Sequence, residues 1–179
     1  MKVKITALLL VCLILLCGCF DSYLPEQNEI EKQFLQNKVA YQKAAEAAFS
    51  YEGEHYFSTT QLSRPENWEG GEGVYIGDME QNVNLIENDA LYKIFTNCNV
   101  YSMHTSVTSL MKVCEFNCAG SGSVYSGVYY TSANEPLCLM DFSVQLAENG
   151  EGFLAELGDW GYYYTEKIED GFFYYEARR

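Results

Sequence analysis

The sequence predicts an α+β domain in which an N-terminal amphipathic helix packs on an antiparallel β-sheet, with one further short helix. Apolar side chains recur at helical spacing between residues 30 and 48. After residue 98, aromatic and apolar runs alternate with turn residues, as in an antiparallel sheet. The 179 residues are too few for two full domains and contain no repeat or low-complexity segment, so we expect one domain.

The first helix is expected after the short polar tether Asp21–Asn28, which contains Pro25, a residue that suits the first turn of a helix. Plotted at about 100° per residue, one face collects the apolar side chains Ile30, Phe34, Tyr41, Ala44, Ala45 and Ala48. Lys32, Lys43 and Glu46 point away from that face, as in a surface helix buried along one side. Small alanines allow close packing on a sheet, and Gly53 marks the end of the helix.

A strand, a loop and a second helix are expected next. His55–Leu62 has the aromatic and β-branched composition of a strand, and Ser63–Gly73 has the proline and glycines of a loop. Asn88 is placed to cap a short helix whose apolar positions are Leu91, Ile94, Phe95 and Cys98.

Five later strands are predicted, at Val100–His104, Leu110–Phe116, Val124–Thr131, Trp160–Ile168 and Phe172–Ala177. Glu169-Asp170-Gly171 is a good hairpin turn between the last two. Leu137–Gln145 is a candidate for a further helix.

The first twenty residues have the pattern of a bacterial lipoprotein signal. Lys2 and Lys4 precede the aliphatic run Ile5–Leu16, which is shorter than the roughly 20 residues that span a bilayer, so a transmembrane anchor is the weaker alternative. The sequence Leu16-Cys17-Gly18-Cys19 resembles the lipobox, in which the cysteine thiol is diacylated before the preceding peptide is removed. We therefore predict a signal peptide at 1–18, a lipid on Cys19, a lipidated tether at 19–28 and a domain at 29–179. A soluble secreted protein is the other alternative.

The lipid determines the predicted location. Each buried acyl methylene contributes about 0.8 kcal/mol and two chains give stable anchoring, so the domain needs no membrane-binding surface of its own. Phe20, not aspartate, follows Cys19. In the lipoproteins that this signal resembles, an aspartate directly after the cysteine favours the inner membrane. We expect the periplasmic side of the cell envelope, with the outer membrane favoured over the inner.

The charge balance restricts the partners. Cleavage removes Lys2 and Lys4 from 11 basic residues, leaving 9 against 25 acidic ones, a formal charge of −16. Nucleic acid is excluded, because its affinity comes from phosphates neutralised by Lys and Arg. An acidic field attracts cationic proteins and speeds their association; solubility alone is the alternative explanation of the acidic charge.

We predict a binding protein that captures a protein partner, in its concrete form an immunity protein against an envelope-targeting toxin. An envelope structural or assembly factor is another class.

Four cysteines remain after cleavage: Cys98, Cys114, Cys118 and Cys138. An even number of cysteines in an oxidising compartment predicts two disulfides, with three possible pairings. A four-thiolate zinc site is the alternative, but the Cys114-x-x-x-Cys118 spacing is one residue longer than the common zinc knuckle.

The sequence offers no convincing active site. His55 and His104 lie in no metal or triad spacing, and no Gly-x-Ser-x-Gly elbow exposes a serine. We therefore predict no catalytic residues, no metal, no cofactor and no enzymatic activity. A carboxylate hydrolase is the alternative, and it would require carboxylates with raised pKa values converging in a concave pocket.

Two resemblances add to this interpretation. Phe34–Phe49, Ala90–Phe95, Gly122–Ser132 and Lys167–Glu176 are similar to a family of small proteobacterial lipoproteins, except that Phe172-Phe173 replaces the usual Trp-Tyr. That similarity implies the architecture and the anchor but no catalytic site. Locally, Ser121-Gly122-Ser123-Val124-Tyr125 resembles the Ser-Gly-x-x-Tyr loop of lysozyme-inhibitor lipoproteins, which implies partner binding by Ser121, Ser123 and Tyr125. The chain lacks that family's nearby Lys-Gly motif, and a simple turn is the alternative.

Overall fold

The computed structural model describes residues 25–51, 53–58, 74–76, 79–81, 89–121, 123–158 and 161–178. The predicted signal peptide, the predicted lipidation site Cys19, the predicted loop Ser63–Gly73 and the predicted cap Asn88 lie outside these residues. Among the described residues, no helix is long and apolar enough to span a bilayer.

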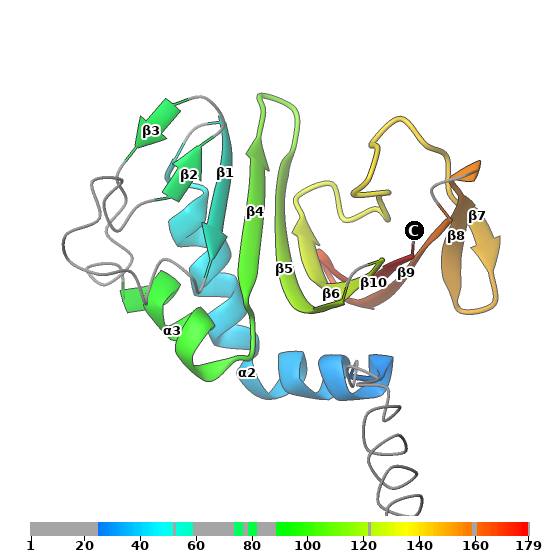
Figure 1. Ribbon diagram of the computed structural model, residues 1–179, viewed down its shortest axis with the longest axis horizontal. Helices are drawn as coiled ribbons and strands as arrows, with labels where there is room; N and C mark the ends of the chain where they lie inside the picture. Colours follow the sequence, from blue (N-terminus) through cyan, green and yellow to red (C-terminus); the bar gives the residue numbers. More distant parts are fainter. Residues whose placement is uncertain are drawn as a thin grey trace, which may run out of the picture.

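One antiparallel sheet and two helices make up the described fold, which confirms the α+β prediction (Figure 1). The helices are α2 (Gln27–Ala48) and α3 (Asp89–Asn97). The strands are β1 (Gly53–Ser58), β2 (Val74–Ile76), β3 (Met79–Gln81), β4 (Ser102–Val107), β5 (Lys112–Ser121), β6 (Val124–Thr131), β7 (Ala147–Asn149), β8 (Gly152–Glu156), β9 (Tyr162–Glu169) and β10 (Phe172–Arg178). Their order in the sheet is β3-β2-β1-β4-β5-β6-β10-β9-β8-β7.

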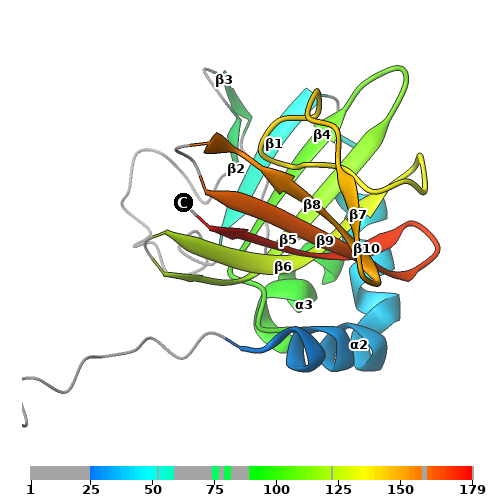
Figure 2. The same cartoon turned by 90° about the vertical axis from the view of Figure 1, so that its right-hand side faces the viewer.

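The sheet is strongly bent, so β4 and β5 stand upright in Figure 1 while β6, β10 and β9 run across the view. Figure 2 shows both helices on one side of this sheet. The β5–β6 pairing shifts register between Asn117 and Ala119, and such a bulge increases local bending and twist.

Helix α2 buries the stripe that its spacing predicts: Ile30, Phe34, Tyr41, Ala44, Ala45 and Ala48 are all buried. The Glu26 backbone N–H donates to the Glu29 carboxylate (3.1 Å), which satisfies one amide at the helix start. The helix kinks at Asn37 (φ −120°, ψ 16°), where the side-chain amide donates to the Gln33 carbonyl (3.0 Å). A side-chain bond to the carbonyl four residues back competes with backbone pairing, and here it lies at the kink that separates the two halves of α2.

The larger core lies between the helices and the sheet. The Phe34 ring packs edge-on against Tyr41 (centroids 5.2 Å apart) and tilted against Phe172 (4.8 Å), and Tyr41 packs on Phe116 (4.9 Å). Helix α3 adds Leu91, Ile94 and Phe95 to the same core.

A second, smaller core lies on the opposite face of the sheet, beneath the segment 132–146. It contains Tyr129, Cys138, Tyr163, Phe173, Tyr175 and Ala177. Along β10 the buried side chains alternate between the faces, because successive residues of a strand point in opposite directions. Phe172 and Tyr174 face the helices, and Phe173 and Tyr175 face the second core.

The segment Leu137–Gln145 is not the helix that its pattern suggested. Several of its backbone groups bond to side chains, and others form backbone turns. The Tyr129 hydroxyl accepts the Leu137 N–H (2.9 Å), and the Asp141 carboxylate accepts both the N–H (2.8 Å) and the hydroxyl (2.7 Å) of Ser143. Such local bonds compete with helical pairing, so the segment forms turns that cover the second core.

The sequence also missed four short strands, β2, β3, β7 and β8. The predicted hairpin turn is confirmed: Gly171 has φ +78°, a conformation that favours glycine, between β9 and β10. Helix α2 begins at Gln27, inside the stretch 19–28 that was assigned to the tether.

Candidate binding site: a pocket of tyrosines and carboxylates

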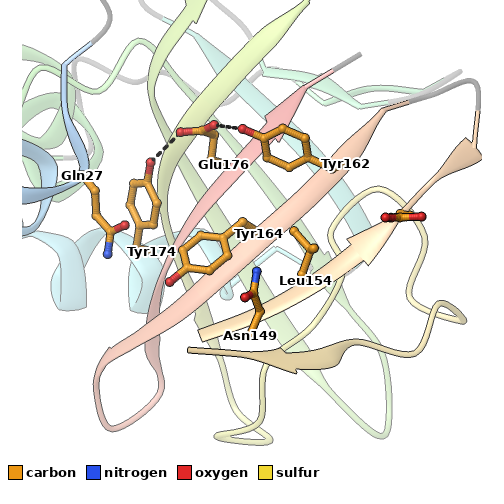
Figure 3. Close-up of a pocket in the computed structure, with 8 residues that line it drawn as sticks. Gln27, Asn149, Leu154, Tyr162, Tyr164, Tyr174 and Glu176 are labelled. Atoms are coloured by element: carbon orange, nitrogen blue, oxygen red, sulfur yellow. Dashed lines mark hydrogen bonds between the residues drawn. The ribbon is translucent and has the colours of Figure 1, made fainter. Parts of the chain in front are cut away.

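A hollow of about 460 Å³ opens at the end of the sheet that α2 leaves uncovered (Figure 3). We call it the tyrosine pocket. Its lining residues come from the start of α2 and from four strands: Gln27, Asn149, Leu154, Glu156, Tyr162, Tyr164, Tyr174 and Glu176.

Strand register brings these side chains onto one face. Tyr164 lies opposite Glu176 in the β9–β10 pairing, and Tyr162 lies opposite Glu156 in the β8–β9 pairing. Residues two apart on a strand share a face, so Tyr162 joins Tyr164, and Tyr174 joins Glu176. The pocket is thus a consequence of the alternation in the last two strands.

Glu176 is the polar centre of the pocket. Tyr162 donates its phenol to Oε1 of Glu176, and Tyr174 donates to Oε2 (3.3 Å), as Figure 3 shows. The Arg178 Nε also lies 3.0 Å from Oε1. The carboxylate of Glu176 is therefore held in one orientation by three donors from three side chains.

The carboxylate of Glu166 holds the side of the pocket that Tyr164 and Gln27 form. Glu166 Oε2 accepts from the Tyr164 phenol (2.6 Å) and from the Gln27 amide (2.9 Å). The same Gln27 amide donates to Glu31 (2.6 Å), which ties the start of α2 to β9. The aromatic walls are thus anchored at both ends and are preorganised.

The phenols of the pocket stay protonated at neutral pH. Burial, the hydrogen bond to Glu176 and the repulsion of that carboxylate raise the pKa of Tyr162 to about 12, and Arg178 offsets part of this. Burial, followed by the hydrogen bond and charge of Glu166, raises the pKa of Tyr164 to about 12. Burial and Glu176 also raise the pKa of Tyr174. These tyrosines therefore donate to carboxylates and leave their ring faces to the pocket.

The rim of the pocket already binds a cation. The Arg178 guanidinium lies over the Tyr162 ring, 5.6 Å from its centroid, while it pairs with Glu176. An aromatic face beside a carboxylate is a general arrangement for binding guanidinium or ammonium groups. None of the eight lining residues is a lysine or arginine, and the carboxylates of Glu156 and Glu176 both reach the hollow. The arrangement favours a cationic side chain as occupant.

The predicted partner-binding residues lie elsewhere, at the β5–β6 hairpin. The backbone of Ser121 pairs with Val124, Ser123 is exposed, and Tyr125 is partly buried. Tyr125 lines a different hollow, on the opposite face of the sheet, together with Glu115. The structure therefore separates Tyr125 from the tyrosine pocket.

The four cysteines are free thiols in the structure, so the two predicted disulfides are absent from it and remain predictions. Cys98, Cys114 and Cys118 belong to the core beneath the helices, whereas Cys138 belongs to the core on the other face. Tyr41 Oη lies 3.7 Å from Cys118 Sγ and 3.5 Å from the Cys98 carbonyl, which places these two cysteines around one phenol. A disulfide needs α-carbons within about 7 Å, so the sheet disfavours any bridge to Cys138.

Within the described ranges, no three His, Cys, Asp or Glu side chains gather as metal ligands. Burial raises the pKa of the Glu115 carboxyl, which lines the hollow with Tyr125, but no second carboxylate lines it. A glycosidase-type pair needs two such groups in one cleft. The prediction that the chain is not an enzyme stays a prediction.

Sequence analysis did not single out the residues of the tyrosine pocket. A signal existed in the runs Tyr162-Tyr163-Tyr164 and Phe172-Phe173-Tyr174-Tyr175-Glu176, where alternation places every second side chain on one face. Which face is buried under the second core, and which stays open beyond α2, depends on the tertiary fold.

Comparisons of the chain with models of protein families, with curated proteins and with solved structures find no match.

Proposed function

We propose that the chain is a lipid-anchored binding protein on the periplasmic side of the bacterial envelope, which captures a cationic protein partner. The tyrosine pocket would receive an arginine or lysine side chain of that partner. The observation that carries the proposal is the placement of Arg178, whose guanidinium already lies against Tyr162 and Glu176. A partner's cation would meet the same chemistry from the open side, between Glu176 and Glu156.

The acidic net charge of the chain also supports a cationic protein partner. The chain remaining after residues 1–18 carries 9 basic and 25 acidic residues, so its field steers cationic proteins toward it. Tyrosines supply large contact area with a polar tip, which is common at the centre of protein interfaces. Anchoring through Cys19 would leave the whole domain surface available for capture.

The concrete role that we favour is immunity against an envelope-targeting toxin, supported by the small size of the chain, its predicted anchor and its acidic charge. Lysozyme inhibition is the second role, supported by the Ser121–Tyr125 hairpin. In that case Ser123, exposed at the hairpin, would enter the lysozyme cleft. Replacing Ser121 and Ser123 by alanine should then abolish inhibition of lysozyme, whereas the immunity role requires no effect of these changes on capture.

The test is capture of envelope proteins by the full-length lipidated chain in detergent. We expect a basic protein that, once purified, rebinds the wild-type chain and binds a Glu156→Gln/Glu176→Gln variant about tenfold or more weakly. The matched control is Glu135→Gln/Glu148→Gln, which removes the same charge at exposed positions outside the pocket. Equal binding to all three chains would contradict the assignment of the pocket.

A further inference from the structure

A second hollow, of about 220 Å³, lies on the face of the sheet opposite to α2, under the segment 132–146. We call it the Glu115 cavity. Strands β5, β6, β9 and β10 and the covering segment supply its lining: Glu115, Asn117, Tyr125, Leu139, Met140, Tyr163, Tyr175 and Ala177. It is smaller than the roughly 300–1,000 Å³ of most ligand pockets, which suits one side chain or one small molecule.

The Glu115 carboxyl group lies in this cavity with few interactions to offset its removal from water. Glu115 accepts a hydrogen bond from the Tyr175 phenol (2.5 Å), and the described residues provide it with no other hydrogen bond and no ion pair. His104 lies opposite it on β4, is exposed, and does not line the cavity. Burial raises the pKa of Glu115, and the attraction of His104 and the bond from Tyr175 offset only part of that rise.

A second polar group in the cavity, the Tyr163 hydroxyl, has no hydrogen bond of good geometry. Tyr163 is fully buried, and its hydroxyl has no partner of acceptable geometry, although the Tyr129 hydroxyl and the Leu139 backbone are its polar neighbours. A buried hydroxyl without a partner costs about 1–3 kcal/mol, so its presence beside Glu115 calls for an explanation. A ligand group that bonds both oxygens supplies one.

We propose that the Glu115 cavity binds an aliphatic primary ammonium group, with Glu115 and Tyr163 as acceptors. An ammonium has three donors and no acceptor, so it can bond the Glu115 carboxylate and the Tyr163 oxygen together. Tyr125 and Tyr175 also line the cavity, and aromatic rings attract cations.

The remaining walls fit the stem of such a ligand. Leu139, Met140 and Ala177 are apolar, and Met140 is 42% exposed. An alkyl chain entering from that side would lie along Met140 while its ammonium reaches Glu115. A guanidinium is planar and broader, so this narrower cavity favours a lysine-type head over an arginine-type head.

This site is independent of the tyrosine pocket, because the two hollows share no lining residue and open on opposite faces of the sheet. The ammonium could come from a free alkylamine or from a lysine side chain of a protein, and both present the same chemistry.

The test uses n-pentylamine, with n-pentanol as a neutral isostere and N-acetyl-lysine amide as the peptide arm. Binding to the full chain is followed by calorimetry and by the NMR signal of the Met140 methyl group, with the buried Met103 methyl on the other face as internal reference. We expect pentylamine to bind at least about tenfold more tightly than pentanol and to shift Met140 but not Met103. Tighter binding of N-acetyl-lysine amide than of pentylamine would assign the ammonium to a protein lysine, and tighter binding of pentylamine would assign it to a free alkylamine.

Glu115→Gln should weaken pentylamine binding by about tenfold or more, and Tyr163→Phe by several-fold. Glu148→Gln, an equal charge change outside the cavity, should leave it unchanged. Thermal unfolding of each variant verifies that it is folded. Equal binding of amine and alcohol, unchanged binding by Glu115→Gln, or no binding of either amine would overturn the proposal.

Discussion

Replacing Tyr175 by phenylalanine tests the electrostatics of the Glu115 cavity. Tyr175 is 2% exposed, and its phenol donates to Glu115 at 2.5 Å. The variant keeps the ring but leaves the carboxylate without its hydrogen bond. Losing a buried hydrogen bond to a charged group costs about 1.5–3 kcal/mol, which corresponds to about 2–4 °C in Tm per kcal/mol for a domain of this size.

The cost should depend on pH. Burial already raises the pKa of Glu115, so in the wild type the stability linked to this group is complete below its unfolded pKa and is lost as pH rises through the folded pKa. The bond from Tyr175 lowers that pKa, so its removal raises it further. Each additional unit of pKa difference costs about 1.4 kcal/mol at high pH and nothing at low pH. Destabilisation by Tyr175→Phe should therefore be larger at pH 8 than at pH 4.

Tyr163→Phe is the matched control. Tyr163 is also fully buried in the same cavity, but its hydroxyl has no hydrogen bond of acceptable geometry, so its removal should not destabilise the fold and should raise the free energy of unfolding by about 1–3 kcal/mol. Urea unfolding of both variants and the wild type from pH 4 to pH 8 measures the difference. A pH-independent loss in Tyr175→Phe, or equal losses in the two variants, would refute the reasoning.

Three further predictions concern the core, the cysteines and the anchor. Phe34→Ala should destabilise the chain by about 3–5 kcal/mol, because Phe34 is fully buried against Tyr41 and Phe172, whereas Leu35→Ala, at a side chain 57% exposed, should be nearly neutral in the same urea titration. In the oxidised chain, peptide mapping should recover a Cys98–Cys118 bridge ahead of any bridge to Cys138, since Cys138 lies across the sheet; a predominant Cys138 bridge would show that the oxidised fold differs. Cys19→Ser should abolish labelling by a fatty-acid analogue in cells, and labelling that persists in this variant would refute lipidation at Cys19.

Much of the fold follows from local sequence signals. The stripe of α2 was predictable because each of its apolar residues recurs at helical spacing and is buried. The β9–β10 hairpin was predictable because Gly171 is suited to the left-handed conformation that its turn requires.

The missed elements lack such signals. Strands β2, β3 and β7 have three residues each, too few for a period of two to stand out. Leu137–Gln145 has apolar positions that fit a helix, but the Tyr129 hydroxyl bonds both backbone groups of Leu137, and the Asp141 carboxylate accepts the Ser143 N–H. The contact with Tyr129 comes from tertiary folding and lies outside the window in which helical spacing was read.

The two hollows could not be located from the sequence, because each depends on which strands are neighbours. Glu115 and Tyr175 are 60 residues apart and meet only through the insertion of β6 between β5 and β10. Glu156 and Glu176 likewise come together because β9 lies between β8 and β10. The acidic composition indicated that a binding site would attract cations, whereas the order of the strands determines where the two hollows lie.

The central claim is capture of a basic protein at the tyrosine pocket, and photo-cross-linking in living cells tests it most directly. A photoreactive phenylalanine would replace Tyr162, which lines the pocket, and in a second chain Leu110, which is 95% exposed and lies outside it. We predict that the chain substituted at position 162 cross-links a basic envelope protein, and that the chain substituted at position 110 does not. The same cross-linked products from both positions, or none from position 162, would contradict the account.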